Sequence, residues 1–136
     1  MSQQNVDLVR SAYEAYNRRD PEAVLACFDP AIDWHTPSSL AWGAHVKGIE
    51  AVGQFFQGLA PYMGDRHEVV VEELLDAGDR VVAITRHVGA APDGLDYDVP
   101  SIMIWTAAGG KLAAMYEQLD TLAMARATEG ATPVVA

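Results

Sequence analysis

The spacing of hydrophobic residues differs between the two halves of the chain. From residue 5 to about residue 18, apolar residues recur at intervals of three and four, which predicts a one-sided helix. Asp20, Pro21 and Glu22 then supply an N-cap acid, a proline at the first helical position and an acid in the first turn, so a short second helix is expected. A third amphipathic helix is predicted from residue 49 to its end at Pro61.

From residue 67 onward the pattern changes to the alternation and the β-branched content that are typical of strands. Strands are predicted at 67–75 and 80–88, with a tight turn between them. A hairpin is predicted from residue 96 to residue 120, because two apolar runs flank the pair Gly109-Gly110.

Two further segments complete the prediction. A brief strand at 31–36 precedes a loop that runs to about residue 48. The tail from about residue 122 is expected to be weakly structured, apart from a helical turn, with an end at about Gly130. Helices first and strands afterwards predict one α+β domain over residues 1–136. We expect a cone-shaped α+β barrel, in which a strongly curved, mostly antiparallel sheet packs on three N-terminal helices around an apolar hole.

The last predicted strand carries an acid in an apolar setting. Side chains alternate across a strand, so Glu117 shares one face with Met115 and Leu119. A carboxylate placed there is either the polar group of a pocket or a residue at an irregular sheet edge.

Composition and charge narrow the classes of function. The chain has 136 residues, half of them apolar, and a net charge of −10 without blocks of like charge. Phosphate binding needs a basic patch, so nucleic acid and anionic membrane surfaces are not expected as partners. The single cysteine, Cys27, lies in an apolar helical context and is expected to be a buried structural thiol. Without a leader or an apolar stretch of about 18 residues, a cytoplasmic protein is expected.

Metal and cofactor sites are not predicted. His45, His67 and His87 are interpreted as solvated or loop residues, and no pair of them has metal-ligand spacing with a carboxylate. Asp93, Asp96 and Asp98 are interpreted as turn formers and solvated edge charges. The sequence contains no phosphate loop, dinucleotide fingerprint or nucleophile motif.

The order of elements resembles the nuclear transport factor 2-like superfamily, and in particular its SnoaL-like members. The matching segments are AYEAYNRRDPEAVLACFDPAIDWHTP, KGIEAVGQFF and IMIWTAAGGKLAAMYEQLD. The resemblance implies a cone of bent sheet and three helices with a deep apolar cavity, often in a homodimer. That superfamily includes ketosteroid isomerase, polyketide cyclases, limonene epoxide hydrolase, scytalone dehydratase and phenazine-biosynthesis proteins, as well as non-enzymatic binding modules, so the fold alone does not define a function.

Ketosteroid isomerase chemistry is not supported when that enzyme's residues are carried over. The position of its base falls on Thr36, that of its oxyanion tyrosine on Ala12, and that of its protonated aspartate on or near Ser101. The resemblance therefore predicts that this chain is not an isomerase of that mechanism.

Two other comparisons within the superfamily converge on Glu117. The arginine and one aspartate of limonene epoxide hydrolase fall on Arg86 and Glu117, although its other aspartate falls on Val88. The catalytic glutamate of the phenazine-type proteins also falls on Glu117, and their histidine lies near His35. The resemblance therefore implies that Glu117 is the main candidate for a catalytic residue.

Alternation adds a candidate partner for this acid. Arg86 shares a strand face with Val82, Ile84 and Val88, so it is predicted to lie in the cavity and to pair with Glu117 across the sheet, since buried charges persist when partnered. Arg86 would then contact substrate directly or act as a structural counter-ion.

The leading hypothesis is a small enzyme of secondary metabolism without a cofactor, which performs general acid/base chemistry on an apolar, oxygenated small molecule in a deep cavity. Cyclisation, isomerisation, dehydration and epoxide opening all fit this set of residues. Glu117 would move the proton. Arg86 would orient the Glu117 carboxylate and hold it charged, or stabilise a developing oxyanion. His35 or Ser101 would be a second polar contact, with the capping of backbone groups as the other role considered for His35. The residues expected to contact the substrate are Trp34, Thr36, Tyr13, Tyr16, Phe55, Phe56, Ser101, Met103, Trp105 and Met115, with packing as the simpler role of the two tyrosines.

The alternative hypothesis is a binding or dimerisation module of the same fold. An Arg86 and Glu117 that both line an enclosed hole would favour catalysis, whereas a cavity filled by its own Trp and Phe side chains would favour the module. A homodimer is expected from the resemblance, with Leu112, Tyr116 and Ile104 as candidate contacts on the outer face of the sheet.

Overall fold

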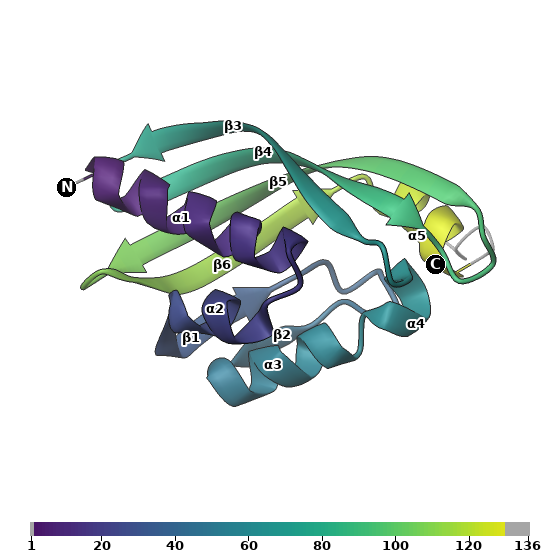
Figure 1. Ribbon diagram of the computed structural model, residues 1–136, viewed down its shortest axis with the longest axis horizontal. Helices are drawn as coiled ribbons and strands as arrows, with labels where there is room; N and C mark the ends of the chain where they lie inside the picture. Colours follow the sequence, from purple (N-terminus) through teal and green to yellow (C-terminus); the bar gives the residue numbers. More distant parts are fainter. Residues whose placement is uncertain (1, 130–136) are drawn as a thin grey trace.

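The computed structural model describes residues 2–129 of the chain (Figure 1). Its helices are α1 (Ser2–Asn17), α2 (Pro21–Ala26), α3 (Ile49–Gln57), α4 (Ala60–Met63) and α5 (Thr121–Glu129). Its strands are β1 (Phe28–His35), β2 (His45–Lys47), β3 (Glu68–Ala77), β4 (Arg80–Ala90), β5 (Asp96–Ala108) and β6 (Lys111–Leu119).

The helical half forms close to where the pattern predicts it. The Asp20 side chain accepts a hydrogen bond from the backbone N–H of Ala23 at 3.1 Å, so the predicted N-cap of α2 is confirmed. The third helix ends earlier than predicted, at Gln57, and Pro61 instead lies in the first turn of α4, where a proline costs no hydrogen bond.

One curved sheet of six strands carries the rest of the fold, in the order β2-β1-β6-β5-β4-β3. β1 pairs with β6 in parallel, and the other neighbours are antiparallel, so the predicted mostly antiparallel sheet is confirmed. β1 begins at Phe28, earlier than predicted, and β2 lies inside the predicted loop. The three residues of β2 are too few for alternation to reveal.

The β5–β6 hairpin turns at Gly109 and Gly110, which both adopt a positive φ, as a two-residue hairpin turn requires. Next to this turn the register shifts between Thr106 and Ala107. Leu112 then points into the core, with 0% of its surface exposed, so its prediction as an outer-face dimer contact is wrong. Tyr116 lies on the outer face and is exposed.

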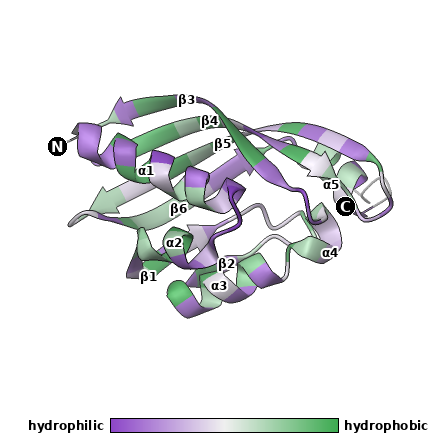
Figure 2. Cartoon of the chain, viewed as in Figure 1, coloured by the Kyte–Doolittle hydropathy of each residue, from purple (hydrophilic) through white to green (hydrophobic). Residues whose placement is uncertain are grey.

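The core lies between the helices and the concave side of the sheet (Figure 1), which confirms the α+β class with a curved sheet that does not close into a barrel. Helix α1 crosses β3 and β4, and Figure 2 shows β4 as hydrophobic over much of its length while α1 carries both kinds of residue. Among residues 2–129, no helix is both long enough and apolar enough to cross a membrane.

A second group of buried residues lies where α4 and α5 approach β5. Met124 and Ala125 of α5 belong to this group and are fully buried. The predicted helical turn is therefore part of a full helix, and the prediction of a weakly structured tail is wrong for residues 122–129. The predicted end near Gly130 lies outside the described residues. Cys27 is half-buried, its thiol lies 3.5 Å from the carbonyl oxygen of Ala23, and burial raises its pKa.

Candidate functional site: an aromatic cavity with a buried tyrosine–histidine–histidine–glutamate chain

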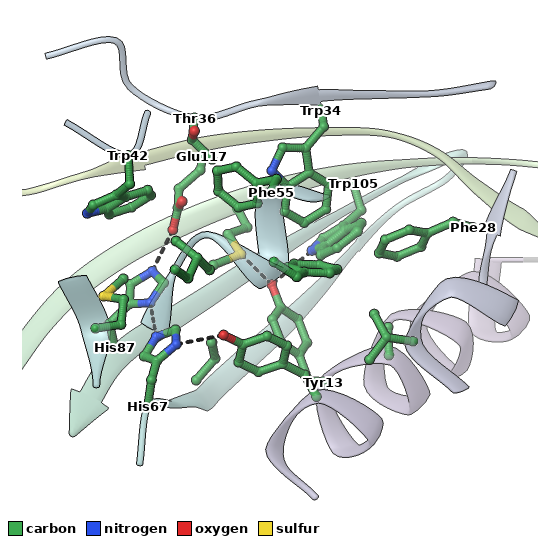
Figure 3. A pocket seen from close by; sticks show the side chains of 18 residues that line it. Tyr13, Phe28, Trp34, Thr36, Trp42, Phe55, His67, His87, Trp105 and Glu117 are labelled. Carbon is green, nitrogen blue, oxygen red and sulfur yellow. Dashed lines mark hydrogen bonds and ion pairs between the residues drawn. The ribbon is translucent and has the colours of Figure 1, made fainter. Parts of the chain in front are cut away.

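An aromatic cavity of about 50 Å³ lies between the sheet and helices α1 and α3 (Figure 3). Its wall is apolar except for a few groups that converge on one end. The lining residues that carry rings or polar groups are Tyr13, Tyr16, Phe28, Trp34, Thr36, Trp42, Phe55, Phe56, His67, His87, Trp105 and Glu117.

Glu117 is the one carboxylate on this wall. Its strand β6 pairs with β5 so that Glu117 lies opposite Met103, which faces the same cavity, and 3% of its surface is exposed. Its Oε2 atom lies 2.6 Å from Nε2 of His87. The prediction that Glu117 lies on an apolar inward face is confirmed, but its partner is a histidine of β4.

The hydrogen-bonded chain continues away from Glu117 through two stacked imidazoles. Nδ1 of His87 lies 2.8 Å from Nε2 of His67, and the ring centroids are 5.0 Å apart with an interplanar angle of 13°. Nδ1 of His67 lies 2.7 Å from the hydroxyl of Tyr16 on α1. The dashed lines in Figure 3 follow this chain from Glu117 to His67 and beyond.

The protonation of the chain follows from its outer end. Burial raises the pKa of Tyr16, so Tyr16 is a neutral phenol. Burial, helped by the nearby His87 and Arg19, holds the pKa of His67 well below its usual value of 6.5, so His67 is a neutral imidazole.

Neutral His67 has one N–H donor and one acceptor nitrogen, so the hydrogen bonds run in a single direction along the chain. With His87 also neutral, that direction is from Tyr16 to Glu117 when Glu117 is ionised, and the reverse when Glu117 is protonated. The directions for an ionised Glu117 are as follows. Tyr16 donates its O–H to Nδ1 of His67, which leaves the His67 proton on Nε2. His67 therefore donates to Nδ1 of His87, and His87 carries its own proton on Nε2 and donates it to the Glu117 carboxylate.

A second group of buried hydrogen bonds rigidifies another part of the cavity wall. Tyr13 accepts a hydrogen bond from the indole N–H of Trp105 at 2.9 Å and donates to the sulfur of Met103 at 2.9 Å. The rings of Tyr13 and Trp105 meet edge to face, with centroids 5.7 Å apart. Since burial also raises the pKa of Tyr13, its hydroxyl stays protonated and committed to this contact.

Two indole donors on the cavity wall have no partner. Nε1 of Trp34 and Nε1 of Trp42 are buried and make no hydrogen bond to any group among residues 2–129. Both side chains line the cavity. A buried N–H without an acceptor costs about 1–3 kcal/mol, so this wall is suited to a bound molecule with acceptor oxygens.

Arg86 does not pair with Glu117, and that prediction is wrong. Its guanidinium lies on the outer face of the sheet, where it pairs with Glu72 and Asp98 and its side chain is 36% exposed. The register explains the difference, because His87 pairs with the inward-facing Val99 and Arg86 pairs with the outward-facing Pro100.

His35 also lies outside the cavity. Trp34 of β1 points inward, so the next residue, His35, points outward, stacks on His45 at a centroid distance of 4.7 Å and meets the edge of Tyr116. The structure therefore does not bring His35 together with Glu117.

The other predicted contact residues divide into two groups. Ser101 and Met115 are buried but do not line the cavity, and the Ser101 hydroxyl is hydrogen-bonded to Thr85. The predicted residues that do line it are Tyr13, Tyr16, Trp34, Thr36, Phe55, Phe56, Met103 and Trp105.

Sequence reasoning missed three residues that line this cavity, namely His67, His87 and Trp42. His67 and His87 were expected in solvent or loops, but they are 7% and 3% exposed. Alternation along the strand could have indicated the position of His87. The face of 80–88 opposite to Arg86 carries Val81, Ala83, Thr85 and His87 and has no formal charge, as expected for a face that points inward. Trp42 lies in the segment between β1 and β2, where no periodicity marks it.

The remaining polar groups add no metal centre. Among residues 2–129, no three His, Cys, Asp or Glu side chains are arranged to hold a metal ion. Asp93 accepts a hydrogen bond from the backbone N–H of Leu95, which is the turn role predicted for it.

Comparison with known proteins places this site in a family. The profile of the SnoaL-like domain matches residues 9–115, and the chain belongs to this family. An uncharacterised protein of Mycobacterium tuberculosis is 25% identical over 113 residues, which are 83% of this chain and 86% of that protein.

Solved structures agree with this assignment. An NTF2-like protein of unknown function from Burkholderia pseudomallei is 24% identical, with a TM-score of 0.87 over 92% of this chain and 97% of that chain. A protein of Jannaschia sp., named as a candidate SnoaL-like polyketide cyclase, is 27% identical, with a TM-score of 0.78 over 95% and 94% of the two chains. The likenesses are those of an NTF2-like fold that processes or binds small molecules.

Proposed function

We propose that this protein is an enzyme that performs general acid/base chemistry on a small, largely apolar, oxygen-bearing molecule in the aromatic cavity. The observation that carries the proposal is the buried contact of 2.6 Å between Glu117 and His87 on the cavity wall. Glu117 accepts or donates the proton, and His87 holds the carboxylate in place from behind.

A purely structural role does not account for this pair. Burying a carboxylate costs several kcal/mol, and replacing a buried ionic pair by apolar residues of similar volume is often neutral or stabilising. A glutamate retained among Trp34, Met103 and Trp105 therefore favours a chemical role, since carboxylates that face a cavity in apolar surroundings are typical of catalytic sites.

The cavity wall also favours a class of substrate. The unpartnered indole N–H groups of Trp34 and Trp42 can donate to carbonyl or hydroxyl oxygens, and the ring faces of Phe55 and Phe56 fit a flat hydrocarbon surface. A ketone with an acidic C–H bond satisfies both, because its oxygen meets a donor while Glu117 removes the proton next to it. Aldol-type cyclisation, double-bond isomerisation next to a carbonyl and dehydration of a β-hydroxy ketone begin with such a step.

A second candidate is a non-catalytic module of the same fold, which binds a small molecule without converting it or serves dimerisation. The free volume of about 50 Å³ favours this candidate, because pockets for drug-sized ligands measure about 300–1,000 Å³ and this cavity is filled by its own aromatic side chains. In either case a ligand larger than a few water molecules displaces Phe55 or Phe56 of α3.

The test uses a set of cyclic ketones in heavy water. NMR follows the rate at which the hydrogens on the carbon next to the carbonyl are replaced by deuterium. We expect the wild-type protein to accelerate exchange next to the carbonyl, and Glu117→Gln to lose about 100-fold or more of that rate, the usual contribution of a general base. Tyr116→Phe on the outer face is the control and should keep the full rate. If Glu117→Gln stays within about threefold of wild type, Glu117 is not the base; if ketones raise the melting temperature without exchange, the protein is a binding module.

A further inference from the structure

We infer that Tyr16, His67, His87 and Glu117 form a proton relay that joins the buried cavity to a pocket on the protein surface. The inference rests on the proposed function, because it supplies the route by which Glu117 exchanges its proton with water. Three observations carry it: the continuity of the chain, its position between two pockets, and the balance of its protons.

The position of the chain is defined by two pockets that share a wall. A surface pocket of about 280 Å³ lies beside α4 and is lined by Arg19, Gly64 and Asp65. Tyr16 and His67 line this pocket and also the aromatic cavity that contains Glu117. The outer end of the chain therefore reaches the surface, whereas its inner end lies in the cavity.

The continuity of the chain leaves no gap for a proton to cross. Its three contacts measure 2.7, 2.8 and 2.6 Å from Tyr16 to Glu117. Both ring nitrogens of His67 and of His87 are used, so each imidazole receives a hydrogen bond on one side and donates one on the other (Figure 3). A carboxylate that only needed a structural partner would require His87 alone.

The protons of the chain balance over one transfer. His87 passes its Nε2 proton to Glu117, His67 passes its Nε2 proton to Nδ1 of His87, and Tyr16 passes its hydroxyl proton to Nδ1 of His67. Water in the surface pocket returns one proton to Tyr16. The net change is one proton moved from the pocket to Glu117, with both imidazoles neutral and converted to the other tautomer. A proton that Glu117 has taken from a substrate leaves by the reverse sequence, which starts from these other tautomers, in which Nε2 of His87 is free to accept.

The surroundings of His67 disfavour a positive charge on its ring, so a proton is passed on by this residue and does not stay on it. His67 is packed against Tyr16, His87 and the ring of Tyr97, and Arg19 adds a positive charge nearby. Burial lowers the pKa of His67 most, and the nearby His87 and Arg19 lower it further, so an imidazolium is disfavoured at this position. A proton that enters this ring on one nitrogen must therefore leave from the other.

Exchange of the His87 imidazole N–H with solvent tests the relay without any substrate. In protein labelled with nitrogen-15 at histidine, we expect His67→Gln to slow this exchange by about tenfold or more. Glutamine offers an acceptor and a donor in place of the two ring nitrogens, but it cannot exchange tautomers. The internal control is the indole N–H of Trp105, which is hydrogen-bonded to Tyr13 outside the chain and should keep its rate.

The direction of the change separates a relay from a loosened fold. A variant that only destabilises the protein exchanges its buried protons faster. Equal or faster exchange of the His87 proton in His67→Gln would overturn the relay. If that variant fails to fold, the same exchange rate is measured in Tyr16→Phe, which removes only the outer hydroxyl, and equal or faster exchange again overturns the relay.

A rescue experiment tests the route itself. In His67→Ala, added imidazole in the surface pocket should restore fast exchange of the His87 proton, and a lack of rescue would contradict the route.

The two proposals can fail separately. Slowed exchange of the His87 proton in His67→Gln, with no ketone exchange by the wild-type protein, would keep the relay and reject the enzyme. Ketone exchange that depends on Glu117, with unchanged exchange of the His87 proton, would keep the enzyme and reject the relay.

Discussion

Burial of a neutral His67 should make the protein less stable in weak acid. The folded pKa of His67 lies well below its unfolded value of 6.5, chiefly because the ring is buried. Below about pH 6.5 the unfolded chain therefore binds a proton at this residue that the folded chain does not bind. This contribution to stability is fully present above pH 6.5 and is lost progressively as the pH falls toward the folded pKa.

The size of the effect follows from linkage. Between about pH 7.5 and pH 5.5, an unfolded histidine with a pKa of about 6.5 changes from mostly neutral to mostly protonated. If folded His67, which is 7% exposed, stays neutral over that interval, the free energy of unfolding falls by about 1.4 kcal/mol from this residue alone. That is a tenfold change in the ratio of folded to unfolded protein.

The assay is urea unfolding of wild-type protein and His67→Gln at both pH values. Carboxylates titrate in both proteins, so the difference between their losses isolates residue 67. We expect wild type to lose about 1.4 kcal/mol more than the variant. His45→Gln, which removes a solvent-exposed histidine, controls for the loss of a histidine as such. Equal losses in wild type and His67→Gln would refute the view that folding holds this ring neutral.

Two other predictions concern stability. Gly64 and Gly78 share a left-handed φ of 78° and 79°, but a Cβ at Gly64 would collide with the carbonyl of Ala90, whereas one at Gly78 meets open space. In thermal denaturation, Gly64→Ala should therefore lower the free energy of unfolding by about 3 kcal/mol or more, and Gly78→Ala by about 1 kcal/mol. Equal losses in the two variants would show that the Cβ at residue 64 does not collide with Ala90. Tyr13→Phe removes the acceptor of the Trp105 indole and should cost about 1–3 kcal/mol in urea unfolding; an unchanged midpoint would show that this donor needs no partner.

The sequence identifies the inward face of the hairpin because that face has a regular alternation. Met103, Trp105, Met115 and Glu117 point into the protein as counting in twos predicts. The count holds because β5 and β6 pair without interruption from Ser101 to Thr106. It fails at Leu112, beyond the register shift, since a shift of one residue exchanges the two faces of a strand.

The partner of Glu117 could not be found from hydrophobicity alone. Both faces of β4 are apolar apart from a few residues, and Val82 and Ile84 lie on the outer face with Arg86. The choice between Arg86 and His87 depends on the register between β4 and β5, which is set by the conformation of the connection after Ala90. A connection longer or shorter by one residue could place Arg86 in the cavity.

The boundary between the aromatic cavity and the surface pocket has different consequences for a ligand and for a proton. Phe56, Leu59 and Met63 line both the aromatic cavity and the surface pocket, so a ligand that enters from this side must move them. A proton needs no such opening, because Tyr16 and His67 reach both spaces and transfer it by changes of bonding within fixed rings. A site that excludes water strengthens the electrostatic interactions of Glu117, but it also isolates that carboxylate from the solvent that must reset its proton. In the proposed enzyme, the histidine pair resolves this conflict, since the site can stay closed around its ligand while Glu117 returns to its starting protonation state.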